Sequence, residues 1–361
     1  MLTRRDFLQV TAATAAMFGP AGGIAAAAAA QKISQEELLK FDSVGQVTLL
    51  NFTDIHAQLV PLYFREPSVN LGVGAVNGLP PHLTGKDFLK RFDIAAGTRD
   101  AYAFSSQDFS ALAQQYGRIG GLAQMATLIK AIRAERPGNT LLVDTGDTWQ
   151  SSYTSLETKG VDMVDAMNAL GVDLMTAHWE FTYGAERVQE LIEKLNFPFL
   201  AGNVRDTEFD EPVFESTKFF ERGGVNIAMI GQAFPYTPIA NPRYMIPEWS
   251  FGIQEDIVRG HVEAARAAGA DLVVLASHNG FDVDRKLASR VDGIDVILTG
   301  HTHDAIPGVI KVGDTLLIAT GSHGKFLGRL DLDVQNRKIK NYSYKLIPIF
   351  SDAITPDPEI D

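Results

Sequence analysis

Five short motifs in this chain carry histidine and carboxylate side chains at spacings that suit metal ligands. Their sequences are Asp54-Ile55-His56, Asp144-Thr145-Gly146-Asp147, Ala177-His178-Trp179-Glu180, Ser277-His278-Asn279 and Gly300-His301-Thr302-His303. Side chains two residues apart in an extended segment point the same way, so the first and last motifs each offer a pair of ligands. A two-metal site needs several nitrogens and a bridging oxygen, which Asp147 can supply, around ions about 3.5 to 4 Å apart.

The histidines of the chain are concentrated in these motifs. The chain has eight histidines, and five of them lie in the motifs. A lone histidine is more often a hydrogen-bonded core or surface residue than a ligand, and we interpret His82 and His261 in that way. The joint pattern instead predicts a dinuclear metal centre with seven ligands, namely Asp54, His56, Asp147, His178, His278, His301 and His303.

Composition excludes several other kinds of chemistry. The 361 residues include no cysteine, so thiol nucleophiles, disulfides and thiolate ligands are excluded, and any metal must be bound by His, Asp, Glu or Asn. The formal charge of -12 disfavours sequence-independent binding to nucleic acid or to anionic lipid. Two bound ions would lower the pKa of water from about 15.7 to about 7 and so supply hydroxide without a side-chain nucleophile.

The motifs follow segments that we predict to be short strands. Apolar, β-rich runs occupy 47–52, 141–144, 173–177, 225–230, 272–277, 296–299 and 316–319. Apolar residues recur at helical spacing within 122–132, 161–170 and 188–195. This alternation predicts a layered α/β domain in which helices cover a sheet core. Because ligands bind at the strand ends of such sheets, the five motifs can converge on one pocket.

Two segments stand apart from this alternation. Residues 59–117 are rich in Gly, Pro and aromatic residues and directly follow the first motif, so we expect an insertion at the mouth of the site. Residues 351–361 have the composition of an exposed linker, which we expect to lead toward a C-terminal domain that this chain lacks. The catalytic domain is then expected to span 31–350.

The first thirty residues have the pattern of an export signal. Arg4 and Arg5 precede Phe7 and Leu8, and a moderately apolar, Ala-rich stretch interrupted by glycine and proline follows. We interpret residues 1–30 as a twin-arginine signal peptide that is removed on export to the periplasm. The alternative, a transmembrane anchor, is disfavoured by the weak hydrophobicity and the breaks.

The order of the motifs resembles that of the calcineurin-like metallophosphoesterases, in the branch of the 5′-nucleotidases. The resemblance extends over about 47–350 and implies a four-layer α/β/β/α core. It implies that a first ion is bound by Asp54, His56, Asp147 and His303. It implies that a second ion is bound by Asp147, His178, His278 and His301.

The third motif departs from the pattern of that branch. Where Gly-Asn-His-Glu is expected, His178 replaces an asparagine ligand and Trp179 replaces the histidine that acts as general acid. With this departure, the export signal, the insertion and the segments 117–121 and 146–150, the chain closely resembles the SoxB family of periplasmic thiosulfohydrolases. That resemblance implies two divalent ions, manganese by preference, and a SoxYZ-like sulfur carrier protein as partner. Hydrolysis of its thiosulfonated cysteine would release sulfate.

The replacement at position 179 has a chemical rationale. A nucleoside alkoxide is a strong base and needs a proton as it departs, which is the work of a positioned histidine. A thiolate has a pKa of about 8.5 and can depart unprotonated, and a persulfide leaves more easily still. We hypothesise that Trp179 is tolerated for this reason and lines a narrow channel for the carrier arm. Simple core packing of the indole is the alternative.

Other polar residues are expected to support the site. We expect Asp144, Glu180, Asn203 and Asn279 to orient ligands through hydrogen bonds, or else only to stabilise their own turns. Arg118 is a candidate for bidentate binding of an oxyanion, although exposed arginines are common. The residues that we expect to act in catalysis are Asp147, His178, Trp179 and Arg118.

Two other functions fit parts of the pattern. A periplasmic 5′-nucleotidase or cyclic-nucleotide phosphodiesterase would use the same metals, but the resemblance places its base-binding aromatic pair on a C-terminal domain. A catalytically inactive binding module would keep the fold without turnover, and the complete ligand set disfavours it.

Overall fold

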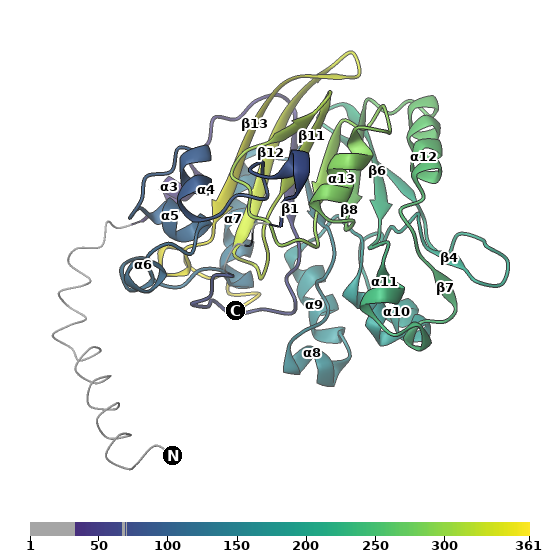
Figure 1. Cartoon of the computed structure of the whole chain (residues 1–361), viewed down its shortest axis with the longest axis horizontal. Coiled ribbons are helices and arrows are strands. Elements are labelled where there is room, and N and C mark those ends of the chain that lie inside the picture. The colour runs from purple at the N-terminus through teal and green to yellow at the C-terminus, as the bar shows by residue number, and fades with distance from the viewer. Residues whose placement is uncertain (1–32, 67–68, 70) are drawn as a thin grey trace, which may run out of the picture.

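The computed structural model describes residues 33–66, 69 and 71–361 (Figure 1). The predicted signal peptide at residues 1–30 lies outside the described residues. Within the described part of the chain, every helix is too short or too polar to cross a membrane.

Two β-sheets form the centre of the molecule. The first sheet has the order β13-β12-β1-β2-β3, and β1 pairs parallel with β2 and antiparallel with β12. Its strands are β1 (Val47–Phe52), β2 (Thr140–Asp144), β3 (Leu174–Met175), β12 (Phe326–Gln335) and β13 (Lys338–Pro348). The second sheet has the order β10-β11-β9-β8-β6-β5, and its middle strands are parallel. Its strands are β5 (Thr217–Arg222), β6 (Val225–Gln232), β8 (Leu272–Ser277), β9 (Val296–Thr299), β10 (Ile310–Val312) and β11 (Thr315–Ala319).

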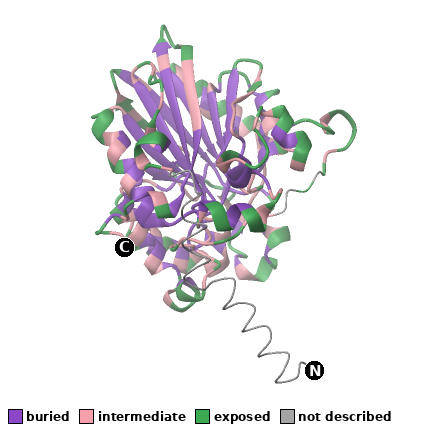
Figure 2. Ribbon diagram, turned by 90° about the vertical axis from the view of Figure 1, so that its left-hand side faces the viewer, coloured by how far each residue is buried: buried purple, intermediate pink, exposed green. Residues whose placement is uncertain are grey.

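An apolar core lies between the two sheets. Val47 and Leu49 of β1 belong to the same buried cluster as Ile227 of β6 and Val274 of β8. Leu50 of β1 points to the opposite face and belongs to a larger cluster that includes the helices. Both faces of the central strands are therefore buried (Figure 2), which explains why these strands appear in the sequence as continuous apolar runs.

Helices cover the outer faces of both sheets. On the side of the first sheet lie α7 (Leu122–Glu135) and α9 (Val161–Leu170), joined by a hydrogen bond from Arg133 to the carbonyl of Gly171. On the side of the second sheet lie α12 (Glu255–Ala267) and α13 (Phe281–Ala288) (Figure 1). The predicted α/β class with α/β/β/α layers is confirmed. The smaller elements are α3 (Gln35–Leu39), α8 (Tyr153–Thr158), η2 (Trp179–Tyr183), α10 (Ala185–Ile192), β4 (Arg205–Asp206), α11 (Thr237–Ala240), η3 (Arg243–Met245), β7 (Trp249–Ser250) and η4 (Ser351–Ala353).

The insertion at 59–117 folds into short helices. They are η1 (Gly74–Val76), α4 (Gly85–Arg91), α5 (Arg99–Phe104) and α6 (Phe109–Tyr116). The longest of these has eight residues, about two turns, which is too short to produce a clear helical period in the sequence. At the end of the insertion, Ile119 pairs with both Leu62 and Phe350, so the segment is joined to the main domain at its base.

The last residues differ from the prediction of an exposed linker. Ile354 and Asp357 are buried, and the Asp357 N–H donates to the carbonyl of Ala123. Lys130 of α7 forms an ion pair with Asp357 at 2.7 Å. Residues 354–361 therefore pack along α7. Composition did not reveal this contact, because the helix lies more than 200 residues earlier in the chain.

Candidate dinuclear metal centre

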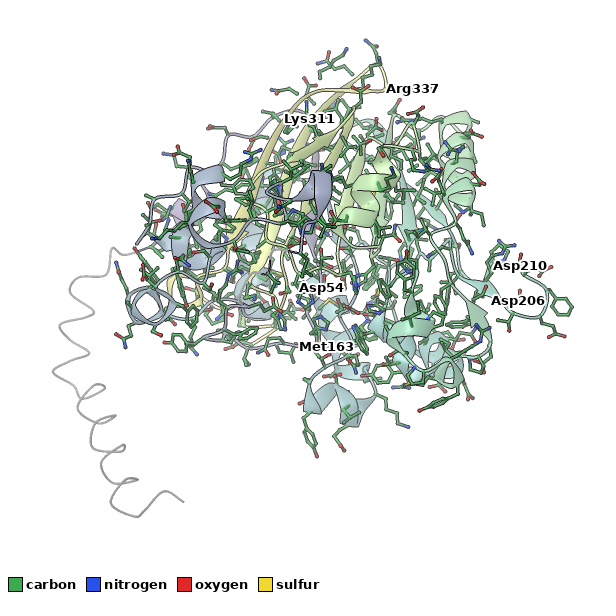
Figure 3. All side chains as sticks on the ribbon, viewed as in Figure 1. Asp54, Met163, Asp206, Asp210, Lys311 and Arg337 are labelled. Carbon is green, nitrogen blue, oxygen red and sulfur yellow. The ribbon has the colours of Figure 1, made fainter. Side chains whose placement is uncertain are left out.

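The seven predicted ligands lie at the carboxyl ends of strands from both sheets. Asp54, labelled in Figure 3, follows β1 near the middle of the molecule. The loops after β1 and β2 run side by side, because the Asp54 N–H donates to the Gly146 carbonyl and the His56 N–H to the Asp147 carbonyl, each at 2.8 Å. His178 follows β3, His278 follows β8, and His301 and His303 follow β9.

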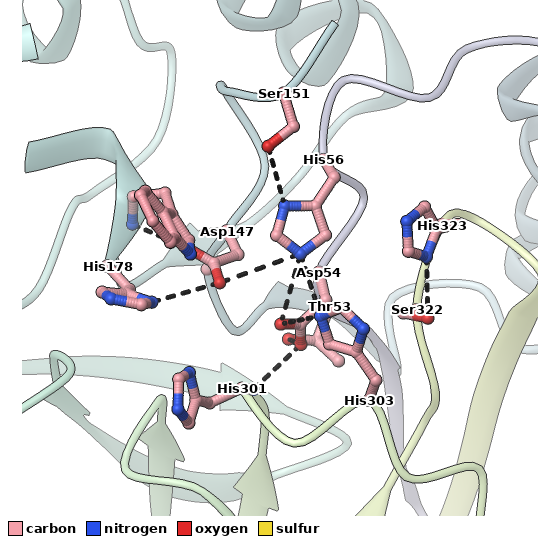
Figure 4. Close-up of polar contacts among 12 residues, drawn as sticks. Thr53, Asp54, His56, Asp147, Ser151, His178, His301, His303, Ser322 and His323 are labelled. Carbon is pink, nitrogen blue, oxygen red and sulfur yellow. Dashed lines mark hydrogen bonds and ion pairs between the residues drawn. The ribbon is translucent and has the colours of Figure 1, made fainter. Parts of the chain in front are cut away.

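The ligands gather in two clusters, in each of which one side-chain atom per residue lies within 4.8 Å of the others. The first cluster consists of Asp54, His56 and His303. The second cluster consists of Asp147, His178, His278 and His301. Figure 4 shows most of these side chains pointing into one space between the strand ends.

Asp147 lies between the two clusters. Its Oδ2 is 3.1 Å from His178 Nδ1 and 3.1 Å from His278 Nε2, both in the second cluster. The same oxygen is 3.9 Å from His56 Nε2 in the first cluster. The resemblance to the metallophosphoesterases implied a bridging role for this carboxylate, and its position suits that role.

The donor atoms fit a cation. Among the described residues, four buried ligand atoms make no hydrogen bond: Asp54 Oδ1, His178 Nε2, His278 Nε2 and His301 Nδ1. Two of them, Asp54 Oδ1 and His278 Nε2, have ion-pair contacts with other ligands. Buried polar atoms without partners are costly and rare in folded proteins, and here they lie together. Imidazole nitrogens and carboxylate oxygens suit several divalent ions, manganese and zinc among them. The site is therefore a candidate for metal binding, and its donors leave the identity of the metal open.

The backbone at the ligands adopts conformations that most residues avoid. Asp54, His56, Asp147 and His303 have φ between 52° and 58°, and His301 has φ 78°. Such left-handed conformations in non-glycine residues cluster at functional sites, where surrounding contacts enforce them. Tight turns at the strand ends thus direct several ligands into one space.

Glu180 joins the loop of Asp147 to that of His178. Its fully buried carboxylate accepts backbone N–H groups from Thr148 at 2.6 Å, His178 at 2.8 Å, Trp149 at 3.2 Å and Asp147 at 3.3 Å. Four buried donors are therefore satisfied by one side chain, and two ligand-bearing turns keep a common geometry. Glu180 was predicted to orient ligands through hydrogen bonds or else only to stabilise its own turn, and its four bonds join the two ligand-bearing loops.

Asp144 contacts the loop that carries Asp147. It accepts the Thr148 hydroxyl at 2.7 Å and the Gly146 N–H at 3.0 Å, so it stabilises the turn that presents Asp147. Burial raises the pKa of Asp144 to about 8, with a further contribution from the nearby Glu180 carboxylate. Its described contacts are those of a turn-stabilising residue.

Asn203 holds the segment whose aromatic ring packs against two ligands of the second cluster. Its side chain accepts the Ala233 N–H at 2.8 Å and donates to the Ala233 carbonyl at 2.8 Å, which fixes the segment that carries Phe234. The Phe234 ring centroid lies 4.0 Å from that of His178 and 4.0 Å from that of His301. The amide therefore orients the apolar wall against which two ligands pack.

Asn279 follows His278 at the end of β8 and stabilises this turn through Asp284. Its amide donates to Asp284 Oδ1 at 2.9 Å, and Ser277 donates to the same oxygen at 2.8 Å. Burial raises the pKa of Asp284 to about 6. This network lies directly under the turn that carries His278.

Burial and neighbouring charges shift the pKa values of the histidine ligands in opposite directions. Burial acts against the charged form of His278, but Asp147 and Asp54 outweigh it and raise its pKa to about 9. For His303, burial is likewise outweighed by Asp54, and the pKa rises to about 10. Burial and neighbouring histidines lower the pKa of His301 to about 3. Metal binding at His278 and His303 must therefore displace protons, whereas His301 is already neutral.

Glu66 and His323 lie at the first cluster and were absent from the predicted site. Glu66, in the insertion, is 2.8 Å from His303 Nδ1. His323 has φ 54°, and its ring centroid is 5.3 Å from that of His56 and 5.4 Å from that of His303. For His323 a signal existed, because Gly321-Ser322-His323-Gly324 follows the strand predicted at 316–319, as the other motifs follow theirs. For Glu66 no local signal existed.

A cavity of about 530 Å³ opens beside the clusters. Its lining includes His301 and His303 together with Glu66, Val69 and Leu71 of the insertion. His82, which we assigned a structural role, lines the same cavity and contacts Asp282 at 2.7 Å. Part of the insertion therefore faces the metal ligands.

Trp179 and Arg118 differ in their relation to the site. The Trp179 backbone N–H donates to Asp147 Oδ1 at 2.7 Å, and the half-buried indole ring lies 5.2 Å from the His178 ring. Partial exposure beside a ligand is more consistent with a channel wall than with core packing. Among the described contacts, the half-exposed Arg118 side chain pairs with Asp352 at 3.1 Å, so its guanidinium is already engaged away from both clusters.

Comparisons with known proteins show a likeness to a sulfate thiohydrolase and a fold shared with a calcineurin-like phosphoesterase. SoxB of Thermus thermophilus, a sulfate thiohydrolase, is similar over 89% of this chain and 60% of that chain, with 36% identity and a TM-score of 0.85. The calcineurin-like phosphoesterase YfkN of Bacillus subtilis matches over 88% of this chain and 94% of that chain, at 19% identity and a TM-score of 0.63, which shows the shared fold.

Curated relatives give a consistent result at lower similarity. The 5′-nucleotidase of Bos taurus is 24% identical over 282 residues, which cover 71% of this chain and 48% of the relative. The chain thus spans about half the length of the curated relatives that it matches. No protein-family model matches the sequence.

Proposed function

From the likeness to SoxB over 89% of this chain and the fold shared with a calcineurin-like phosphoesterase, we infer that the chain is a calcineurin-like metallophosphoesterase, and we propose that it is a dinuclear metal-dependent thiosulfohydrolase of the SoxB type. Its substrate is the thiosulfonated cysteine of a SoxYZ-like sulfur carrier protein. Water cleaves the sulfur–sulfonate bond, so that sulfate is released and a persulfide stays on the carrier. The likeness to SoxB over most of the chain is the observation that carries this proposal.

The residues of the chain have distinct tasks in this reaction. Two divalent ions at the clusters would supply Lewis acidity and lower the pKa of water. Asp147 lies between the clusters and orients His178 and His278 through contacts of 3.1 Å. The seven ligands together position the reactants. Trp179 stands where the related enzymes have a general acid, and a persulfide leaving group needs no proton from that position.

The proposal extends to the surroundings of the enzyme. Manganese is the proposed resident ion, the twin-arginine signal at 1–30 directs export, and the periplasm is the place of action. The catalytic unit spans 31–350. The insertion at 59–117 contributes to the channel through which a carrier arm reaches the ligands, and Trp179 forms part of its wall.

A direct assay tests the substrate assignment. The purified protein is loaded with manganese and offered a thiosulfonated carrier protein in one reaction and AMP in another, while sulfate and phosphate are measured. We expect sulfate release from the carrier and little phosphate from AMP. The His278→Ala variant, which lacks a buried ligand, serves as the inactive control.

A 5′-nucleotidase or cyclic-nucleotide phosphodiesterase is the second candidate, because the curated relatives that match the chain are 5′-nucleotidases. The same assay separates the two functions. Phosphate release without sulfate release would overturn the thiosulfohydrolase and leave the metal centre intact.

A further inference from the structure

A single carboxylate of the insertion contacts both the first cluster and the segment after β11. Glu66 Oε1 lies 2.8 Å from His303 Nδ1, and Glu66 Oε2 accepts the Ser322 hydroxyl at 3.0 Å. Lys325 Nζ is 3.6 Å from the same Oε2. The Lys325 side chain is 1% exposed, and its ammonium makes no hydrogen bond to the described residues, so Glu66 is its charge partner.

This network determines which ring nitrogen of each histidine carries the proton. A carboxylate accepts hydrogen bonds and donates none, so His303 must donate from Nδ1, and its Nε2, 3.2 Å from Asp54 Oδ1 and 2.9 Å from His56 Nε2, is the nitrogen that faces the first cluster. Ser322 has one hydroxyl hydrogen, which it donates to Glu66. In the remaining bond, His323 Nδ1 lies 2.9 Å from Ser322 Oγ and must therefore be the donor. The lone pair of His323 is then on Nε2.

His323 is held beside the first cluster by its backbone. Its N–H donates to the Asp54 carbonyl at 2.7 Å, and its left-handed φ of 54° turns the side chain toward the ligands. Figure 4 shows the ring nitrogen that does not contact Ser322 on the side of His56. The His323 side chain is 22% exposed, so the ring is not sealed within the core.

We propose that Glu66 is the positioning residue of the first cluster. It fixes His303 as a ligand through Nε2, and through Ser322 it fixes His323 as a hydrogen-bond acceptor that faces the same cluster. Among the described residues of the insertion, none makes a hydrogen bond or ion pair to His178 or His278 of the second cluster. The inference rests on the proposed two-metal centre, but it is independent of the substrate that this centre acts on.

Metal binding is the first test. Metal-free protein is titrated with Mn²⁺ in a calorimeter. Loss of a carboxylate behind a ligating histidine lowers metal affinity by about 10- to 100-fold. We expect Glu66→Gln to weaken the binding of one of the two ions by this factor and the binding of the other by less than about threefold. Glu135→Gln is the matched control, because Glu135 also contacts a buried cation, Arg329, at 2.8 Å but lies on α7. Equal affinities for wild type and Glu66→Gln would overturn the proposal.

The protonated nitrogen of His323 is the second test. In Glu66→Gln the new amide N–H₂ donates to Ser322 Oγ, so the serine hydrogen turns toward His323 Nδ1 and the ring proton moves to Nε2. Long-range ¹⁵N–¹H spectra of the Zn²⁺-loaded protein should show an Nδ1–H ring at His323 in wild type and in Glu135→Gln. The same ring should be Nε2–H in Glu66→Gln.

Two further results bear on the proposal. Ser322→Ala cuts only the link to His323, so both affinities for Mn²⁺ should stay within about threefold while the tautomers of His323 mix. An unchanged tautomer in Glu66→Gln would overturn the relay. A third equivalent of Zn²⁺ at His323 would do so as well, because Glu66, His303 and His323 are close enough to bind an ion themselves. None of these measurements depends on enzymatic activity. They can therefore fail or succeed independently of the thiosulfohydrolase assignment.

Discussion

The two ligand clusters are supported in different ways. In the second cluster His278 is fully buried, and His178 and His301 pack against Phe234, which is held by the second sheet. In the first cluster the side chains of His56 and His303 are 10% and 26% exposed, and the support for His303 comes from the insertion. One half of the site is thus part of the core, whereas the other half is completed by a surface segment.

This difference should affect how tightly each cluster holds its ion and how easily solvent and substrate reach it. A ligand set enclosed by packed strands loses little freedom when an ion binds, because its side chains are already fixed. A set that depends on a surface segment can open to solvent and exchange its ion more readily. We therefore expect the second cluster to bind its ion more tightly and the first cluster to face the substrate.

The largest expected effect comes from removing a ligand of the enclosed cluster. His278→Ala should lower turnover by about 1000-fold or more, because several kcal/mol of charge stabilisation are lost. It should also lower the bound metal, measured by elemental analysis, to about one ion per chain or less. His56→Ala, in the open cluster, should retain the ion of the second cluster. Equal loss of both ions in the two variants would remove the distinction between the clusters.

The next effect concerns folding. Glu180→Ala leaves four buried N–H groups without an acceptor, so the free energy of unfolding should fall by about 2 to 4 kcal/mol. Urea denaturation of the metal-free protein measures this quantity. Glu190, an exposed residue of α10 that pairs with Arg187, supplies the control, and its replacement by alanine should change stability by less than about 0.5 kcal/mol. A similar loss of unfolding free energy in both variants would show that the four hydrogen bonds of Glu180 do not stabilise the fold.

A smaller effect tests the role of position 179. Because a positioned general acid contributes about 100-fold or more, Trp179→His should raise the hydrolysis of AMP by about 10- to 100-fold. Sulfate release from the carrier should change little, since the persulfide departs without a proton. Trp179→Phe is the control that keeps an aromatic ring without a titratable group. Unchanged sulfate release with no phosphate release in Trp179→His would leave the leaving-group argument without support.

The smallest effect compares two buried carboxyl groups, Asp144 at the end of β2 and Asp284 in α13. The pKa of Asp144 is raised to about 8 and that of Asp284 to about 6, in both cases by burial. In the unfolded chain an aspartate has a pKa of about 3.9, so above pH 4 the folded state binds more protons than the unfolded state. The free energy of unfolding therefore falls as pH rises, up to about pH 8 for Asp144 and about pH 6 for Asp284.

Replacement of each aspartate by asparagine isolates its part of this slope. Between pH 6 and 8, Asp144→Asn should remove a slope of at most about 1.4 kcal/mol per pH unit, measured by urea denaturation in EDTA. Asp284→Asn should leave that interval unchanged and act only below about pH 6. Parallel curves for wild type and Asp144→Asn from pH 6 to 8 would show that the Asp144 carboxyl is ionised in the folded protein.

Much of the fold was predictable because its signals are local. The strands at 47–52, 272–277 and 296–299 were predicted at their observed bounds, since a strand buried on both faces forms a continuous apolar run. By contrast, β12 and β13 were not predicted. Arg329 and Asp331 are fully buried in β12. Their charges interrupt the apolar pattern, and besides each other they contact the distant residues Glu135 and Thr48.

The sequence by itself determined the kind of chemistry, because metal ligands have few possible residue types and lie at fixed offsets from strand ends. Only the tertiary structure divided these ligands into an enclosed and an open cluster. It also brought Glu66 to His303, which is 237 residues away, and packed residues 354–361 along α7. Such contacts depend on how distant segments meet in space, and no spacing along the chain records them.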